Sequence, residues 1–131
     1  MLARTEAVRD VGLLDAGFFM YCEEMDWCRR SATLGYEALC VPKAVVTHHA
    51  GASTRQRAGP MFVALWRSRL RYFAKHEGPV RARVLRGTVR AAIRARRVSD
   101  RVAQARGRID AEARRERSRA YAAILAGGAI P

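Results

Sequence analysis

The chain has 131 residues, which is the length of one ordinary domain, and half of them are hydrophobic. No apolar run approaches the ~20 residues that a membrane-spanning helix needs, and the first residues lack the basic-then-apolar pattern of a signal peptide. The three cysteines form no C-x-x-C pair, so the sequence signals neither a zinc knuckle nor a disulfide framework. We therefore expect a cytoplasmic protein, either soluble or peripheral at the inner face of the plasma membrane.

The charge is divided unevenly along the chain. Residues 1–54 carry five basic and seven acidic groups, a net charge of −2, whereas residues 55–131 carry 20 basic and five acidic groups, a net charge of +15. This asymmetry predicts a basic tail that meets an anionic partner, such as a membrane surface, a nucleic acid or an acidic protein. The preference for arginine over lysine suits phosphate binding, and it is equally what a GC-rich coding bias would produce.

The first third of the chain predicts two helices. Thr5 is a suitable N-cap for a short helix that ends at about Val11, before Gly12. A second helix is expected from Glu23 to Leu34, because its acids lie in the first turn, its arginines follow, and Gly35 suits the C′ position. The residues between the helices predict a loop with three buried aromatic side chains, namely Phe18, Phe19 and Tyr21.

The next segment is β-prone. Residues 36–41 and 44–48 predict two short strands joined by a turn at Pro42 and Lys43, since the second stretch is β-branched at its centre. A loop of small residues over 49–54 follows.

Helical spacing dominates the rest of the chain. An amphipathic helix is expected to end near His76, and a second one is expected over 80–97. Residues 99–126 are mostly alanine and arginine with a thin apolar stripe, so we expect a helix that is poorly packed. The apolar positions of the helix over 80–97 are Val80, Val84, Leu85, Val89 and Ile93.

Three carboxylates lie within four residues at Glu23, Glu24 and Asp26. They repel one another unless something uses them, and a helix N-terminus offsets the cost by a few tenths to ~1 kcal/mol. A catalytic or ligand-binding role is one interpretation of this cluster. A solvated first helical turn is the other, and acids are common there.

The pair His48-His49 ends the second predicted strand. An imidazole at a strand end can point into a cleft, where it binds a metal or acts as a base. A packed or surface position is the alternative for both histidines.

The order of these elements is more specific than any one of them. The chain has Gly12-Leu-Leu-Asp-Ala-Gly-Phe-Phe-Met-Tyr-Cys-Glu-Glu-Met-Asp-Trp-Cys-Arg-Arg30, then Leu-Gly-Tyr, then Val41-Pro-Lys-Ala-Val-Val-Thr-His-His-Ala-Gly-Ala-Ser53. Over about residues 1–76 this order closely resembles the family 2 glycosyltransferases of GT-A type, especially the bacterial rhamnosyltransferase-like branch. The family pattern is G-x-x-D-x-x-F-F-M-Y-x-E-D-x-D-x-x-x-R, a G-[YW] turn, a V-P-x-A strand and H-x-x-G-x-S.

The resemblance implies roles for individual residues. Glu24 stands where the family has an aspartate that acts as general base, and the extra methylene moves the carboxylate by roughly 1 Å. Asp26 corresponds to a second acid that holds the helix and contacts the acceptor, and Glu23 and Trp27 to positions that shape the acceptor site. His48 corresponds to a ligand of the divalent metal, Mg²⁺ or Mn²⁺, that holds the donor diphosphate. The implied substrates are a nucleotide-sugar donor and a glycan or lipid-linked acceptor.

The resemblance also implies a fold, namely the acceptor-side part of an α/β GT-A (Rossmann-like) domain over 1–59. A helix over 60–78 would pack on that part. A basic helical tail over 79–131 would meet anionic headgroups or a lipid-diphosphate acceptor, and a solvated helical extension is the alternative for it. No Asp-x-Asp motif or Gly-rich phosphate loop is present, so we expect an incomplete fold that transfers no sugar alone. Two alternatives stay open: a non-enzymatic basic module that binds a membrane surface or nucleic acid, and an inactive remnant. The tail has no recognised nucleic-acid motif, so we expect no specific nucleic-acid partner.

Overall fold

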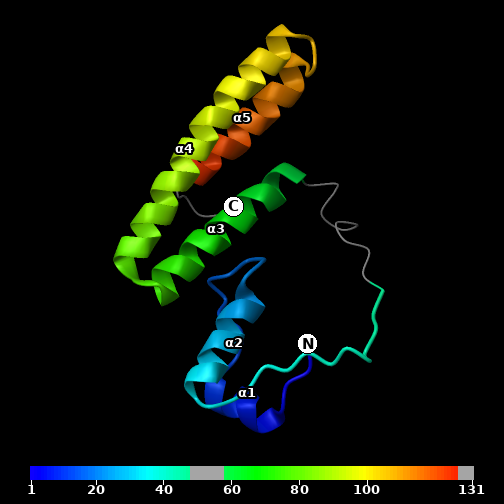
Figure 1. Cartoon of the computed structure of the whole chain (residues 1–131), viewed down its shortest axis with the longest axis vertical. Coiled ribbons are helices and arrows are strands. Elements are labelled where there is room, and N and C mark those ends of the chain that lie inside the picture. Colours follow the sequence, from blue (N-terminus) through cyan, green and yellow to red (C-terminus); the bar gives the residue numbers. More distant parts are fainter. Residues whose placement is uncertain (48–57, 127–131) are drawn as a thin grey trace.

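A computed structural model describes residues 1–47 and 58–126. Five helices lie in these ranges: α1 (Thr5–Val11), α2 (Glu23–Thr33), α3 (Ala58–His76), α4 (Gly78–Ala105) and α5 (Ala111–Ala126). Figure 1 shows α4 and α5 as an antiparallel pair with α3 against them, and α1 and α2 on the far side of α3. Helix α3 therefore lies between the α1–α2 region and the α4–α5 pair, and we call it the platform helix.

The ends of α1 and α2 follow the turn chemistry of their sequences. Gly12 closes α1 with a φ of 81°, and Gly35 follows α2 with a φ of 84°. After α2, the amide of Gly35 donates to the carbonyl of Ala32, and the amide of Tyr36 donates to that of Ser31. These two bonds form a Schellman motif, which satisfies carbonyls at the end of α2 and favours glycine at the left-handed position.

The apolar core lies among α3, α4 and α5. It consists of buried side chains from all three helices, with Trp66 and Leu85 packed against them: Val63, Val89, Ile93, Tyr121 and Ile124. Full burial of an aliphatic side chain stabilises the fold by about 1.5–3 kcal/mol, so this cluster is the main stabilising feature of the three helices.

The prediction that residues 99–126 pack poorly is wrong. Helix α4 continues to Ala105, the chain turns over residues 106–110, and α5 returns along α4. Tyr121 and Ile124 are among the most buried residues of the core. Asp100 is buried beside them, where it accepts hydrogen bonds from Tyr121 Oη at 3.1 Å and from Arg117 Nη1 at 3.0 Å. The apolar stripe of α5 is narrow, but it faces a helix pair that can cover it.

The expected strands are absent from the described part of the chain. Residues 36–47 form an irregular, extended segment with a turn at Pro42 and Lys43, and the remaining described residues are helices, turns and bends. A strand is stable only when a neighbouring strand accepts its backbone hydrogen bonds, and no such neighbour lies beside this segment among the described residues. The α/β class of the fold therefore stays a prediction.

One predicted buried position in the first loop is wrong, and two apolar positions of α4 lie on its exposed side. Val80 and Val84 are exposed, and Phe19 is 64% exposed, whereas its neighbour Phe18 is buried. Only one edge of α4 faces α3 and α5, so the apolar positions on its other side remain in solvent.

Candidate functional site

The candidate site begins at a strained turn ahead of α2. Tyr21 and Cys22 have φ values of 70° and 67°, and both are non-glycine residues in the left-handed region. Such a conformation costs energy for each residue, and it is enriched at sites where the chain must aim particular side chains. Here the turn sets the direction of the first turn of α2, which carries Glu23, Glu24 and Asp26.

The three acids of this turn lie in different surroundings. Glu24 is exposed at the N-terminal end of α2. Glu23 is half-buried, and its Oε2 atom is buried without a hydrogen-bond partner in the described structure. Asp26 is fully buried, with a relative exposure of 0%. Adjacent carboxylates of one helix turn therefore have separate environments, which is how a protein gives similar groups different roles.

Asp26 is held by three basic side chains. Its Oδ1 atom lies 2.7 Å from Lys75 Nζ and 2.7 Å from His76 Nε2, both at the end of α3. Its Oδ2 atom accepts a hydrogen bond of 2.9 Å from Arg30 Nε within α2. Burial raises the pKa of Asp26, but the hydrogen bonds from Lys75, His76 and Arg30 outweigh it and leave the pKa below its ordinary value. Asp26 thus fastens α2 to α3 as a carboxylate.

Asp15 extends this charged cluster into the loop before α2. It accepts a hydrogen bond of 2.7 Å from Lys75 Nζ and another of 2.8 Å from the backbone amide of Gly17. Arg71 lies 3.2 Å from the same carboxylate. The hydrogen bond from Lys75 is the main reason that the pKa of Asp15 lies well below its ordinary value. Lys75 therefore bridges two carboxylates, and its own pKa is raised by Asp15 and then by Asp26.

Two further side chains of α2 hold the loop after α1. Trp27 is buried, and its Nε1 donates to the carbonyl oxygen of Gly12 at 2.8 Å. The guanidinium of Arg30 donates to the carbonyls of Val11 and Leu13 at 2.6 and 2.8 Å. The accepting carbonyls belong to the last residue of α1 and to the two residues that follow it. Trp27 and Arg30 therefore hold the chain in place where it leaves α1 toward the acidic turn.

The predicted metal ligand His48, with its neighbour His49, lies outside the described residues. Within 1–47 and 58–126, no group of three or more His, Cys, Asp or Glu side chains could hold a metal ion. The acidic turn of α2 therefore offers no complete metal site by itself.

Sequence reasoning found the acidic turn but missed its partners. Lys75 and His76 lie about fifty residues further along the chain, and nothing near them in sequence indicates a buried carboxylate. Asp15 was within reach, because it occupies the aspartate position of the G-x-x-D element.

No protein family model matches the chain, and no solved structure is detectably similar to it. Two curated relatives are similar: the N-acetylglucosaminyl-diphospho-decaprenol L-rhamnosyltransferases of Mycobacterium tuberculosis strains CDC 1551 / Oshkosh and ATCC 25618 / H37Rv. Each is 34% identical over 94 residues, which is 71% of this chain and 30% of the relative. The chain thus spans less than a third of the relatives' length, and the similarity points to a glycosyltransferase in general.

Proposed function

We propose that these residues form the acceptor-side part of an inverting glycosyltransferase of the family 2, GT-A type. The enzyme would transfer a sugar from a nucleotide-sugar to a glycan or lipid-linked acceptor in cell-surface polysaccharide synthesis. The observation that carries the proposal is that two carboxylates of α2 differ in exposure. Glu24 is exposed, whereas Asp26, two residues away, is buried against three basic groups. The similarity to two rhamnosyltransferases supports it.

Glu24 is the general base in this proposal. Its carboxylate takes the proton of the acceptor hydroxyl while that oxygen forms a bond to the anomeric carbon of the donor sugar. The bond from that carbon to the nucleoside diphosphate breaks at the same time, and the leaving group takes the electron pair. A direct in-line attack of this kind inverts the anomeric centre.

Asp26 is assigned a positioning role. A carboxylate that is fully buried and held by Lys75, His76 and Arg30 is shielded from an acceptor, and its lowered pKa makes it a weaker base. Glu23 and Trp27 are proposed to line the acceptor side, Glu23 through its carboxylate and Trp27 through the loop that it holds.

The donor and the metal require residues beyond those described. In the proposal, His48 would help to hold a Mg²⁺ or Mn²⁺ ion, and such an ion would supply positive charge next to the diphosphate. The Rossmann-like part of the full-length enzyme would supply the remaining ligands and the nucleotide pocket.

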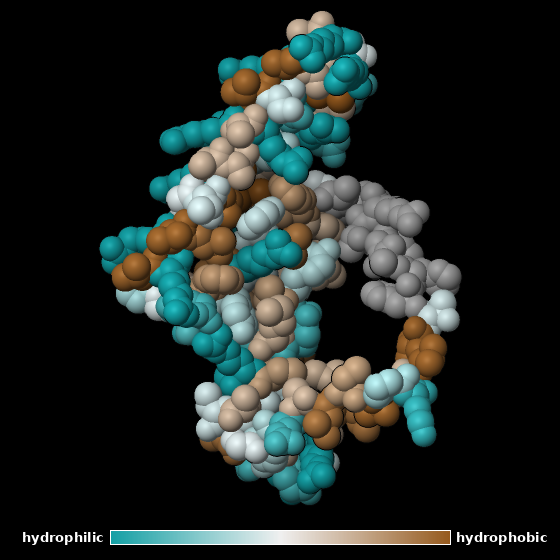
Figure 2. Space-filling view, viewed as in Figure 1, coloured by the Kyte–Doolittle hydropathy of each residue, from teal (hydrophilic) through white to brown (hydrophobic). Residues whose placement is uncertain are grey.

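The extended segment over 36–47 supports an incomplete α/β domain. Its apolar side chains are exposed, with Val45 at 87% and Val46 at 83%. Figure 2 shows hydrophobic atoms along this segment where it projects from the helices, just ahead of the grey residues. Exposed β-branched residues in a segment without a neighbouring strand among the described residues are what a strand presents before it joins a sheet. We propose that a sheet from the rest of the enzyme takes up this segment.

The location of the enzyme is proposed to be cytoplasmic, at the inner face of the plasma membrane. No helix in the described ranges is long and apolar enough to cross a membrane. The basic helices would instead contact anionic headgroups from one side.

Glu24→Gln in the full-length enzyme tests the proposal. The variant keeps the shape of the side chain and removes the proton acceptor, so kcat should fall about 10²–10⁴-fold while donor binding stays nearly unchanged. Glu23→Gln is the matched control, and it should act mainly on KM for the acceptor. An unchanged kcat for Glu24→Gln would contradict the role of Glu24. Robust sugar transfer by residues 1–131 alone would contradict the incomplete domain.

A further inference from the structure

The outer face of α4 carries exposed apolar residues along most of its length. In Figure 1, α3 and α5 both lie on one side of α4, and the buried residues of α4 face them. On the opposite side the exposed residues are apolar or small, and we call them the outer stripe: Val80, Val84, Gly87, Ala91, Ala95, Val98 and Val102. The four valines of the stripe have relative exposures between 43% and 66%. Figure 2 shows hydrophobic atoms beside hydrophilic ones along this edge of the molecule.

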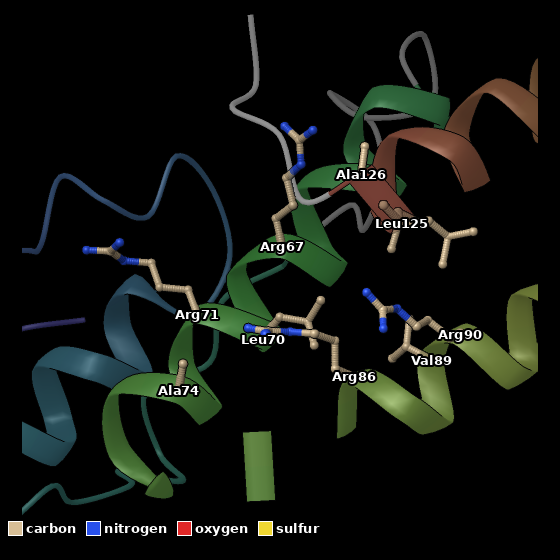
Figure 3. A pocket seen from close by; sticks show the side chains of 10 residues that line it. Arg67, Leu70, Arg71, Ala74, Arg86, Val89, Arg90, Leu125 and Ala126 are labelled. Carbon is tan, nitrogen blue, oxygen red and sulfur yellow. The ribbon is translucent and has the colours of Figure 1, made fainter. Parts of the chain in front are cut away.

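The inner face of α4 is already covered. Val89 and Ile93 belong to the core, and Asp100 accepts hydrogen bonds from α5. Arg86 and Arg90 line a cavity together with residues of α3 and α5, and Figure 3 shows both extending from α4 into the space between the helices. These side chains therefore do not belong to the outer face.

The spacing of the outer stripe keeps it nearly straight. Val80, Ala91 and Val102 follow one another at intervals of eleven residues. Eleven residues over three turns give about 3.67 residues per turn, close to the 3.6 of an α-helix, so the stripe runs almost along the helix axis. A seven-residue repeat fails, because Arg94 stands seven residues after Gly87. The stripe therefore suits a flat surface better than a second helix that would coil around α4.

A row of arginines runs along one edge of the outer stripe. Arg83, Arg94 and Arg101 are spaced by eleven and then seven residues, which places them on the same side of the helix. All three are exposed, and their side chains form no hydrogen bond or ion pair with the described residues. The acidic residue of α4, Asp100, is buried on the inner face. The outer face thus combines apolar side chains with positive charge that no neighbouring acid offsets.

This combination distinguishes between possible occupants of the outer face. Two outer stripes packed together would bring two arginine rows close to each other, which disfavours a second copy of the chain. Nucleic acid would attract the arginines but leave the valines in water. An anionic lipid surface uses both kinds of side chain, because guanidinium groups bind phosphates in the headgroup layer while apolar side chains enter the layer below it.

We propose that the outer stripe of α4 lies flat on the surface of an anionic bilayer. The valines enter the boundary between headgroups and acyl chains, and Arg83, Arg94 and Arg101 contact lipid phosphates from one edge of the stripe. This docking face rests on the proposed location at the plasma membrane and deepens it, because it names the side of the protein that contacts lipid. It does not depend on Glu24 or on sugar transfer, since its evidence lies in α4 and its test measures binding.

The main test removes apolar surface from the stripe and leaves every charge in place. Val84→Ser with Val98→Ser is the stripe variant, and Val45→Ser with Val46→Ser is the matched control, because it removes two exposed valines outside α4. Serine and valine have similar helix propensities, and circular dichroism verifies the helix content. Binding of the full 131-residue chain to phosphatidylglycerol vesicles and to phosphatidylcholine vesicles is measured by co-sedimentation at physiological salt.

The stripe variant should bind phosphatidylglycerol vesicles about fivefold to tenfold more weakly than the unmodified chain, and its control within about twofold of it. Phosphatidylcholine vesicles should bind the unmodified chain more weakly, because they offer the arginine row no net negative charge.

A second pair of variants tests the arginine row. Arg83→Gln with Arg94→Gln should weaken binding to phosphatidylglycerol vesicles by about fivefold or more, whereas Arg115→Gln with Arg119→Gln, two exposed arginines of α5, should weaken it less. Both variants lose the same charge, so a diffuse attraction would affect them equally.

Equal binding by the stripe variant and its valine control would overturn the docking face and leave the proposed membrane location standing. Equal losses in the two arginine variants would also overturn it. The absence of phosphatidylglycerol binding by the unmodified chain would overturn both the docking face and the location, without bearing on the role of Glu24. A dimer of the unmodified chain that the stripe variant converts to a monomer, with vesicle binding unchanged, would assign the stripe to a second copy instead.

Discussion

The region of α1 and α2 and the region of α3, α4 and α5 are held by different forces. The three later helices share an apolar core that includes Val63, Val89 and Ile93. The earlier region buries few large apolar side chains and is attached to α3 mainly through Asp15 and Asp26, which meet Lys75 and His76. Ser68 adds one hydrogen bond of 2.7 Å to the carbonyl of Met20.

This difference predicts different sensitivities. Apolar burial depends little on pH and salt, whereas a charged attachment depends on the protonation of its carboxylates. It also predicts that Glu24 lies in the less stable of the two regions, because fewer buried apolar side chains hold that region. Local stability of this kind can be measured residue by residue through hydrogen exchange.

The largest effect is expected for Ile93→Ala. Ile93 is buried in the three-helix core, so the variant should lower the free energy of unfolding by about 3–4 kcal/mol through lost burial and the cavity left behind. Because α3 is the platform for both regions, amide exchange should speed up in α2 as well as in α3, α4 and α5. The control is Val98→Ala, at a position 58% exposed, which should change stability by no more than about 0.5 kcal/mol. Loss of protection confined to one region would contradict the shared platform.

Asp26→Ala should break the attachment and spare the core. Removing one member of a buried ionic cluster costs about 3–5 kcal/mol of unfolding free energy. We expect about 3 kcal/mol, because Lys75 still pairs with Asp15, and Arg30 still donates to the carbonyls of Val11 and Leu13. Exchange should become faster in α1 and α2 while α4 and α5 keep their protection. Glu24→Ala is the control on the same helix turn, with an expected change below about 1 kcal/mol. Equal destabilisation of all five helices would show that the two regions unfold together.

Acid should weaken the same attachment more gently than Asp26→Ala. Asp15 and Asp26 have lowered pKa values, so their stabilising effect is present above the unfolded value of about 4 and is lost as pH falls through the folded values. Protonation removes the charge but leaves the side chains able to hydrogen-bond. Exchange-corrected protection of α2 should therefore fall below about pH 4 before that of α4. In Asp26→Asn this pH dependence should be smaller, and an unchanged profile would exclude Asp26 as its source.

Much of the local structure could be predicted from the sequence, because caps and turns act over a few residues. Thr5, Gly12, Glu23 and Gly35 predicted the bounds of α1 and α2 to within a residue or two. The predicted N-cap itself is wrong, because Thr5 is the first residue of α1 and Arg4 occupies the N-cap without a side-chain hydrogen bond. The attachment of Asp26 to Lys75 and His76 could not be predicted in this way, since nothing local indicates which distant cation will meet a carboxylate. Glu24 was identified only through a family resemblance.

The errors share a physical cause, which is that burial depends on neighbours. The β-branched residues over 44–47 predicted a strand, but a strand needs a second one for its hydrogen bonds. The alanine- and arginine-rich sequence of α5 did not indicate that Tyr121 is a core residue, because the apolar side chains that bury it belong to α3 and α4. Phe19 was predicted to be buried, yet it is 64% exposed, whereas Phe18 next to it is buried.

The smallest effect is expected for Tyr121→Phe, which tests whether polar contacts also matter inside the three-helix region. Tyr121 Oη donates to Asp100 Oδ2 at 3.1 Å, and burial, followed by this hydrogen bond, raises the pKa of Tyr121. Phenylalanine keeps the ring in the core and removes one hydrogen bond to a charged group. Arg117 still pairs with Asp100, so the free energy of unfolding should fall by only about 1 kcal/mol. Urea denaturation measures it, with Tyr72→Phe, on a half-buried ring outside this cluster, as the control. A loss as large as that of Asp26→Ala would mean that a buried ionic contact is as important in this region as in the other, and the contrast between them would fail.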